Sequence, residues 1–123
     1  MVKKYLVCGG RDFNDYARME EVLDKIIGNN PFWLVHGAAR GADKLSGEYA
    51  RTRDCKGVFE YPADWDTHGK AAGHIRNKEM LLNERPDLVI AFPGGVGTAN
   101  MISLAKKHNY EVLEVPNIDI RKP

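Results

Sequence analysis

Cysteine is scarce in this 123-residue chain, which holds only Cys8 and Cys55. Their spacing matches neither a metal site nor a redox pair, which favours reduced, cytosolic thiols. No apolar run approaches the length that crosses a bilayer, and the first residues lack the hydrophobic stretch of a signal peptide. We therefore expect a cytoplasmic protein that has no membrane partner.

An excess of charge is also missing. Eighteen Lys and Arg residues face 17 Asp and Glu residues, so the net charge is +1. Proteins that bind duplex nucleic acid usually carry a basic excess, so such a partner is not expected, although a local basic pocket is compatible with this balance. There is no repeat, low-complexity segment or linker. We expect one globular domain over residues 1–116 and a C-terminal tail over 117–123.

Strand-like and helix-like patterns alternate along the chain. Helices are predicted where apolar residues recur every three or four positions, and strands where short apolar runs end in glycine or proline. The alternation predicts an α/β fold, a Rossmann-like three-layer α/β/α domain with a mainly parallel five-stranded sheet in the order 3-2-1-4-5. The predicted strands are 2–8, 32–36, 58–61, 88–92 and 110–115, and the predicted helices are 16–27, 42–53, 70–84 and 98–108.

Glycine-rich turns follow three of these strands. The fourth strand runs into Pro93-Gly94-Gly95-Val96-Gly97-Thr98, which opens a helix. Backbone N–H groups and the positive end of the helix dipole then point to one place outside the sheet, where a phosphate binds well. The other turns are Gly9-Gly10-Arg11 and Gly37-Ala38-Ala39-Arg40-Gly41. Three such turns predict a nucleotide pocket, although a tight turn alone also requires glycine.

The order of these motifs resembles the SLOG superfamily, and within it the YspA-type (cpYpsA-related) branch, which is common in bacteria and phages. The superfamily includes the LOG nucleotide hydrolases and the fold of the DNA-processing protein A. The resemblance covers nearly the whole chain and implies a Rossmann-like domain that binds a nucleotide or a nucleotide-derived ligand. It rests on Gly9-Gly10-Arg11-Asp12-Phe13, on His36-Gly37-Ala38-Ala39-Arg40-Gly41-Ala42-Asp43, on Pro62-Ala63-Asp64-Trp65, Gly69-Lys70 and Gly73, on Arg76-Asn77-Lys78-Glu79-Met80, and on Pro93-Gly94-Gly95-Val96-Gly97-Thr98.

The chain departs from the LOG enzymes at their catalytic positions. Arg76 and Met80 match the Arg-Lys-x-x-Met motif, but Asn77 replaces its lysine, and Met101 stands where those enzymes carry a glutamate. A thioether can neither take a proton nor stabilise an oxocarbenium-like centre. The departure argues against LOG-type hydrolysis and leaves ligand binding intact.

Several charged candidates also have a structural interpretation. Arg11 either reaches the ligand or pairs with Asp12 or Asp15. Arg40 has the planar fork that suits phosphate. Asp43 either holds a ribose hydroxyl or complements a helix dipole.

The same holds for candidates near the third and fourth strands. Arg76 binds phosphate or lies on a solvated helix face, and Asn77 reads a base edge or sugar hydroxyl. Trp65, which follows Asp64, stacks on a base or packs under a loop. His36 is expected to be structural, and Cys8 is expected to be a small buried hydrophobe.

The leading hypothesis is a sensor, carrier or sequestering module for a nucleotide-derived small molecule, with no cofactor and no metal. The alternatives are a nucleotide N-glycosidase or deoxyribosyltransferase-like enzyme, which would need Asp43, Glu48 or Asp64 as its carboxylate, and a single-stranded DNA-binding protein. A homodimer through the last two helices is compatible with each. The candidate ligand-binding residues are Gly9, Gly10, Arg11, Gly37, Arg40, Gly41, Asp43, Asp64, Arg76, Asn77, Gly94, Gly95, Gly97 and Thr98.

Overall fold

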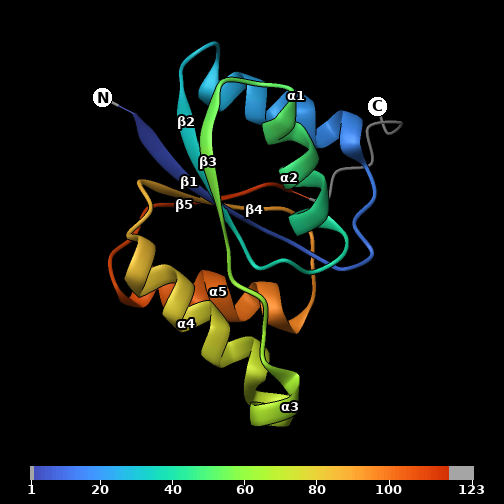
Figure 1. Ribbon diagram of the computed structural model, residues 1–123, viewed down its shortest axis with the longest axis vertical. Helices are drawn as coiled ribbons and strands as arrows, with labels where there is room; N and C mark the ends of the chain where they lie inside the picture. The colour runs from blue at the N-terminus through green and yellow to red at the C-terminus, as the bar shows by residue number, and fades with distance from the viewer. Residues whose placement is uncertain (1, 117–123) are drawn as a thin grey trace.

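A computed structural model describes residues 2–116 of the chain, so the predicted tail at 117–123 lies outside the described residues. Strands and helices alternate along it (Figure 1). The strands are β1 (Lys3–Cys8), β2 (Phe32–His36), β3 (Cys55–Glu60), β4 (Leu88–Ala91) and β5 (Val112–Glu114). The helices are α1 (Tyr16–Ile27), α2 (Ala42–Arg51), α3 (Trp65–His68), the 3-10 turn η1 (Gly69–Ala71), α4 (Ala72–Glu84) and α5 (Val96–Lys107).

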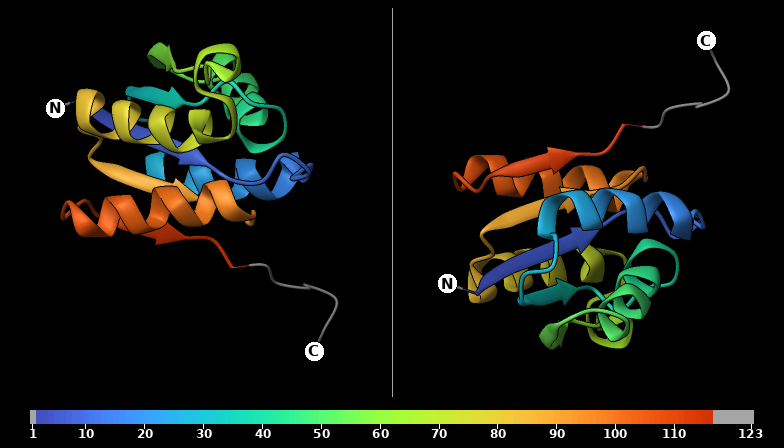
Figure 2. Two further views of the ribbon diagram at one scale, coloured as in Figure 1. Left: turned by 90° about the horizontal axis from the view of Figure 1, so that it is seen from below. Right: turned by 90° about the horizontal axis from the view of Figure 1, so that it is seen from above.

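The sheet has five strands in the order β3-β2-β1-β4-β5, and every pairing is parallel. This confirms the predicted Rossmann-like topology. Helices α1 and α2 cover one face of the sheet, and α4 and α5 cover the other (Figure 1). Because the strands are parallel, the loops that follow β1, β2 and β4 all leave the sheet at one edge (Figure 2). In this fold class, ligands bind at that edge, where the strand order reverses between β1 and β4.

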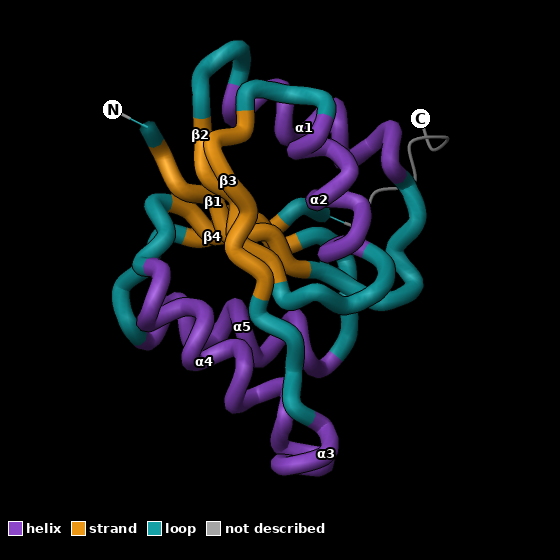
Figure 3. Tube along the Cα trace, in the orientation of Figure 1, coloured by secondary structure: helices purple, strands orange, loops and turns teal. Residues whose placement is uncertain are grey.

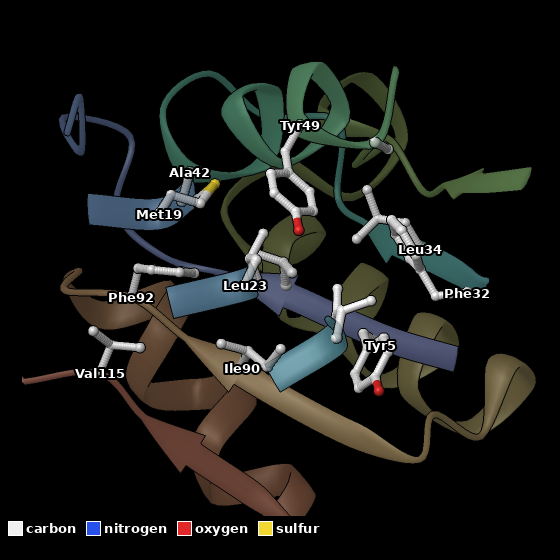
Figure 4. Packing of buried hydrophobic residues seen from close by; sticks show 13 residues of the cluster. Tyr5, Met19, Leu23, Phe32, Leu34, Ala42, Tyr49, Ile90, Phe92 and Val115 are labelled. Atoms are coloured by element: carbon white, nitrogen blue, oxygen red, sulfur yellow. The ribbon is translucent and has the colours of Figure 1, made fainter. Parts of the chain in front are cut away.

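The core has two parts because side chains alternate along each strand. On β1, Tyr5 and Val7 pack with α1 and α2, whereas Leu6 and Cys8 pack with α4 and α5. Figure 4 shows the first part, in which the ring of Tyr49 from α2 lies over the sheet. All of these side chains are buried. Two covered faces hold the sheet rigid beneath the loops at its carboxyl edge.

Some predicted boundaries were wrong. Strand β3 begins at Cys55 instead of residue 58, because a parallel edge strand is built by backbone pairing with β2 and does not need a continuous apolar run. Helix α2 ends at Arg51, and the chain turns over Thr52 and Arg53 before β3 begins. The four-residue helix α3 was not predicted at all; it leads into α4 at the foot of the molecule (Figure 3). Helix α5 begins at Val96 instead of Thr98, so its first turn includes a glycine.

Candidate functional site

The three glycine-rich turns meet at the carboxyl edge of the sheet. The Gly10 N–H donates to the Pro93 carbonyl at 2.9 Å, and the Ala42 N–H donates to the Gly10 carbonyl at 3.1 Å. Gly41 has a φ of +79°, and a Cβ there would overlap the Gly10 carbonyl oxygen. A Cβ on Gly94 would lie 2.6 Å from the Gly10 nitrogen. The predicted convergence is therefore present, and at Gly41 and Gly94 the fold itself requires glycine.

Helix α5 starts inside this junction without a side-chain cap. Its N-cap residue is Gly95, and its first turn contains no acidic side chain. The first N–H groups of any helix lack acceptors within the helix. The Ala99 N–H is satisfied by the Gly95 carbonyl at 3.0 Å. The N–H groups of residues 96–98 have no acceptor within the described range 2–116, and together with the helix dipole they make this place favourable for an anion.

A cleft of about 1160 Å³ opens over the start of α5. Its walls also include the turn after β1, the first turns of α1 and one side of α4. It is large enough for a nucleotide-sized ligand. Most of the predicted site residues line it: Gly9, Gly10, Arg11, Asp43, Arg76, Asn77, Gly94, Gly95, Gly97 and Thr98.

Arg76 holds two loops in place, and its Nη2 has no hydrogen-bond partner among residues 2–116. Its Nη1 donates to the carbonyl oxygens of Gly37 and Tyr61, the second at 3.1 Å, and its Nε donates to Asn77 Oδ1 at 3.0 Å. Burial lowers the pKa of its guanidinium, which nevertheless stays charged near neutral pH. Because Nε and Nη1 are used, Nη2 is the group with which Arg76 can reach the cleft.

Asn77 joins α4 to the start of α5. Its Nδ2 donates to the Gly97 carbonyl and to Asn100 Oδ1, both at 3.0 Å. Since its Oδ1 accepts from Arg76, the amide is already satisfied by the protein. The predicted role of reading a base edge is therefore better described as positioning α5 and Arg76.

Asp43 is a buried carboxylate at the inner wall of the cleft. It accepts a hydrogen bond from the Ala39 N–H at 3.2 Å. Burial raises the pKa of Asp43 to about 6, although the Ala39 N–H and the Arg76 guanidinium act in the opposite direction. A Cβ on Gly37 would lie 2.9 Å from Asp43 Oδ2 and would overlap Arg76 Nη1, so packing explains that glycine.

Four predicted residues do not line the main cleft: Gly37, Arg40, Gly41 and Asp64. Asp64 Oδ1 accepts from the Thr67 N–H at 3.1 Å and caps α3. Arg40 is exposed and pairs with Asp12 at 3.4 Å. Arg40 and Gly37 instead line a second, smaller cavity beside the first.

Arg11 and Trp65 lie together where the two cavities adjoin. The Arg11 Cζ is 5.2 Å from the centroid of the Trp65 ring, and 48% of the Trp65 surface is exposed. Within residues 2–116, neither expected acidic partner pairs with Arg11, because Asp12 pairs with Arg40 and Asp15 caps α1 through the Arg18 N–H. A guanidinium held only by an aromatic ring is free to meet an anion.

Several other candidates have structural roles. His36 Nδ1 accepts from the Ala38 N–H at 2.9 Å, and burial lowers the pKa of this imidazole, so it is neutral near pH 7. Burial raises the pKa of Cys8 to about 12, which keeps its thiol protonated and unreactive. Met101 is fully buried in the core under α5. No group of His, Cys, Asp and Glu side chains within the described range 2–116 is arranged to hold a metal ion.

Lys70 and His74 also line the cleft, although neither is among the ligand-binding residues predicted from the sequence. The sequence does contain a signal for them, because positions 70, 73, 74, 77 and 80 follow helical spacing and all line the cleft.

In residues 2–116, no helix combines the length and the apolarity needed to cross a membrane.

Fold and cleft together define the class: a Rossmann-like α/β domain with a glycine-lined cleft at the switch point of its sheet. The family model described as YspA, cpYpsA-related SLOG family matches residues 4–68. The chain is also 34% identical over 120 residues to the Gene 61 protein of Mycobacterium phage D29, covering 91% of this chain and 95% of the phage protein. The chain therefore belongs to the YspA, cpYpsA-related SLOG family.

Solved structures show the same fold at low sequence identity. The C-terminal domain of a Pyrococcus furiosus hydrogenase is 19% identical, with a TM-score of 0.52 and coverage of 94% of both chains. A UDP-N-acetylglucosamine 2-epimerase is 15% identical, with a TM-score of 0.56; the match covers 93% of this chain and 31% of the epimerase. At these identities the likeness concerns the fold alone.

Proposed function

We propose that the protein binds a phosphorylated nucleoside, with the phosphate seated on the first turn of α5. Membership of the SLOG family and the α/β fold are consistent with a nucleotide-related function. The main support for the proposal is the presence of glycine at position 97, where neither the backbone conformation nor the packing requires it. Gly97 has no positive φ, and a Cβ added there would meet no heavy atom within 4 Å.

The fold therefore gives no reason for glycine at position 97. Glycine in a helix costs about 1 kcal/mol relative to alanine, so an unneeded glycine in α5 is a disadvantage to stability. Gly97 is exposed and lines the cleft, so any side chain there would fill the space in front of the free N–H groups. Close approach of a ligand to the backbone accounts for the glycine.

The side chains around this turn suit the rest of a nucleotide. Arg11, Lys70 and Arg76 bring positive charge to the cleft. The Thr98 side chain, which also lines it, supplies a hydroxyl at the helix start. Asp43 can accept a hydrogen bond from a ribose hydroxyl, and the exposed Trp65 ring offers a surface on which a base stacks.

Titration calorimetry tests the proposal. Each of the four ribonucleoside 5′-monophosphates is compared with its unphosphorylated nucleoside, and inorganic phosphate is the third ligand. We expect micromolar or tighter binding of at least one monophosphate and at least tenfold weaker binding of its nucleoside, because the phosphate makes the charge-assisted contacts. Absence of heat for every nucleotide, or equal affinity with and without phosphate, contradicts the proposal.

Cleavage of the N-glycosidic bond is a second candidate, favoured by one observation. Of the three carboxylates considered for this chemistry, only Asp43 lines the cleft, and its pKa of about 6 suits a group that exchanges a proton near neutral pH. The test is incubation with the 5′-monophosphates followed by chromatography for free base. Release of base by the wild-type protein, and its loss in Asp43→Asn, would establish this activity. No release over a prolonged incubation leaves binding alone.

A further inference from the structure

A second cavity of about 330 Å³ adjoins the main cleft. Among the described residues, its wall contains three arginines, Arg11, Arg40 and Arg76, together with Trp65, and no acidic side chain. The main cleft, in contrast, includes Asp12, Asp15, Glu21 and Asp43 among its lining residues. The second cavity is thus the more anion-selective of the two compartments.

The two cavities are neighbours and share part of their walls. Arg11, Ala39, Trp65 and Arg76 line both of them. Arg40 lines only the second, where its guanidinium, 73% exposed, is held by a single weak pair with Asp12 at 3.4 Å. A ligand that occupies the main cleft can therefore extend past Trp65 and exchange the Asp12 pair of Arg40 for a stronger one.

Sheet geometry indicates how far apart the two anion positions lie. Helix α5 begins after β4, and the loop that carries Arg40 follows β2, with β1 between them. At about 4.8 Å between neighbouring strands, β2 and β4 are about 10 Å apart where the two loops leave the sheet. Two directly linked phosphates are too close together to span this separation, whereas phosphates on opposite sides of a ribose are suited to it.

We propose that the ligand is a nucleoside carrying two phosphoryl groups on opposite sides of its ribose, of which a 3′,5′-bisphosphate is the simplest example. The 5′-phosphate lies on α5, and the second phosphate lies among Arg11, Arg40 and Arg76. This inference rests on the proposed function, because it assumes that α5 holds the first phosphate.

The experiment uses the base that binds best as a 5′-monophosphate. Calorimetry compares its 5′-monophosphate, its 3′,5′-bisphosphate and its 5′-diphosphate, the last two differing only in where the second phosphate lies. We expect the bisphosphate to bind at least tenfold more tightly than the monophosphate, and the diphosphate to gain less than threefold. Arg40→Gln should abolish the advantage of the bisphosphate and leave monophosphate affinity within twofold. Asp12→Asn, the matched control, frees Arg40 and should keep or increase the advantage.

The outcomes separate the two proposals. If the monophosphate binds but the bisphosphate gains nothing, if the diphosphate binds as tightly as the bisphosphate, or if Arg40→Gln weakens both ligands equally, the second-phosphate inference is wrong and the proposed function stands. If no nucleotide binds, both are wrong. Thermal melts check that each variant folds. Because positions 12 and 40 are exposed, we expect both substitutions to leave the fold intact.

Discussion

Replacing Gly97 with glutamate should change the stability of the fold and the affinity for the ligand in opposite directions. The first turn of α5 has no acidic side chain, and a Cβ at position 97 meets nothing. Glutamate there interacts favourably with the helix dipole, by about 0.3–1 kcal/mol, and has a better helix propensity than glycine by about 0.5 kcal/mol. We therefore expect Gly97→Glu to raise the free energy of unfolding by about 1 kcal/mol.

Ligand binding should change in the opposite direction. The new carboxylate occupies the cleft beside the N–H groups of residues 96–98 and repels a phosphate. Loss of charge-assisted hydrogen bonds worth about 1.5–3 kcal/mol corresponds to roughly 10- to 100-fold weaker binding of the 5′-monophosphate. A gain in stability together with weaker binding would show that the ligand, and not the fold, requires glycine at this position.

Urea denaturation and calorimetry measure the two effects on the same samples. Ser103→Glu is the matched control, because Ser103 is exposed on the same helix and does not line the cleft. It adds the same charge and should leave affinity within twofold. Wild-type affinity in Gly97→Glu would place the phosphate elsewhere, and a loss of more than about 1 kcal/mol in stability would mean that the fold needs this glycine.

Three further substitutions test other parts of the site. Gly94→Ala places a Cβ 2.6 Å from the Gly10 nitrogen, so urea denaturation should show a loss of about 1–3 kcal/mol, in contrast to Gly97→Ala, which should be neutral or stabilising. The pKa of Asp43 is raised from 3.8 to about 6, so the folded state binds more protons than the unfolded state between these values; stability should fall as pH rises from about 4 to about 6, by up to about 3 kcal/mol, and Asp43→Asn should remove this dependence in urea melts at pH 4 and pH 7. If the free energy of unfolding of the wild-type protein depends weakly or not at all on pH, the result would contradict the burial of this carboxylate. Trp65→Ala removes a half-exposed ring, so calorimetry should show binding weaker by about 1–3 kcal/mol while the thermal midpoint barely moves; unchanged affinity would exclude stacking on the base.

The sheet could be predicted because its pattern is local. Alternating strand and helix signals and right-handed crossovers leave few topologies, and the order β3-β2-β1-β4-β5 is among them. The glycine turns could be predicted for the same reason, since each directly follows a strand. Their meeting follows from the parallel sheet and required no knowledge of side chains.

The side chains of the site depend on contacts between distant segments, which local patterns do not report. Arg40 and Arg76 were equivalent candidates from sequence, but Arg76 is fixed by the carbonyl oxygens of Gly37 and Tyr61, and Arg40 faces a separate cavity. Asn77 is satisfied by the Gly97 carbonyl, which lies on the next helix. Helix α3 was missed because four residues give no measurable periodicity, and only its cap, Asp64, left a sequence signal.

The central claim is that the backbone N–H groups at the start of α5 hold a phosphate. Titration of the isotopically labelled protein with a ribonucleoside 5′-monophosphate, followed by amide NMR, tests it at the atoms concerned. We expect saturable shifts of the amide signals of Val96, Gly97 and Thr98, with much smaller shifts when the unphosphorylated nucleoside is added. Saturable shifts that leave these three signals in place, or equal shifts with both ligands, would contradict it.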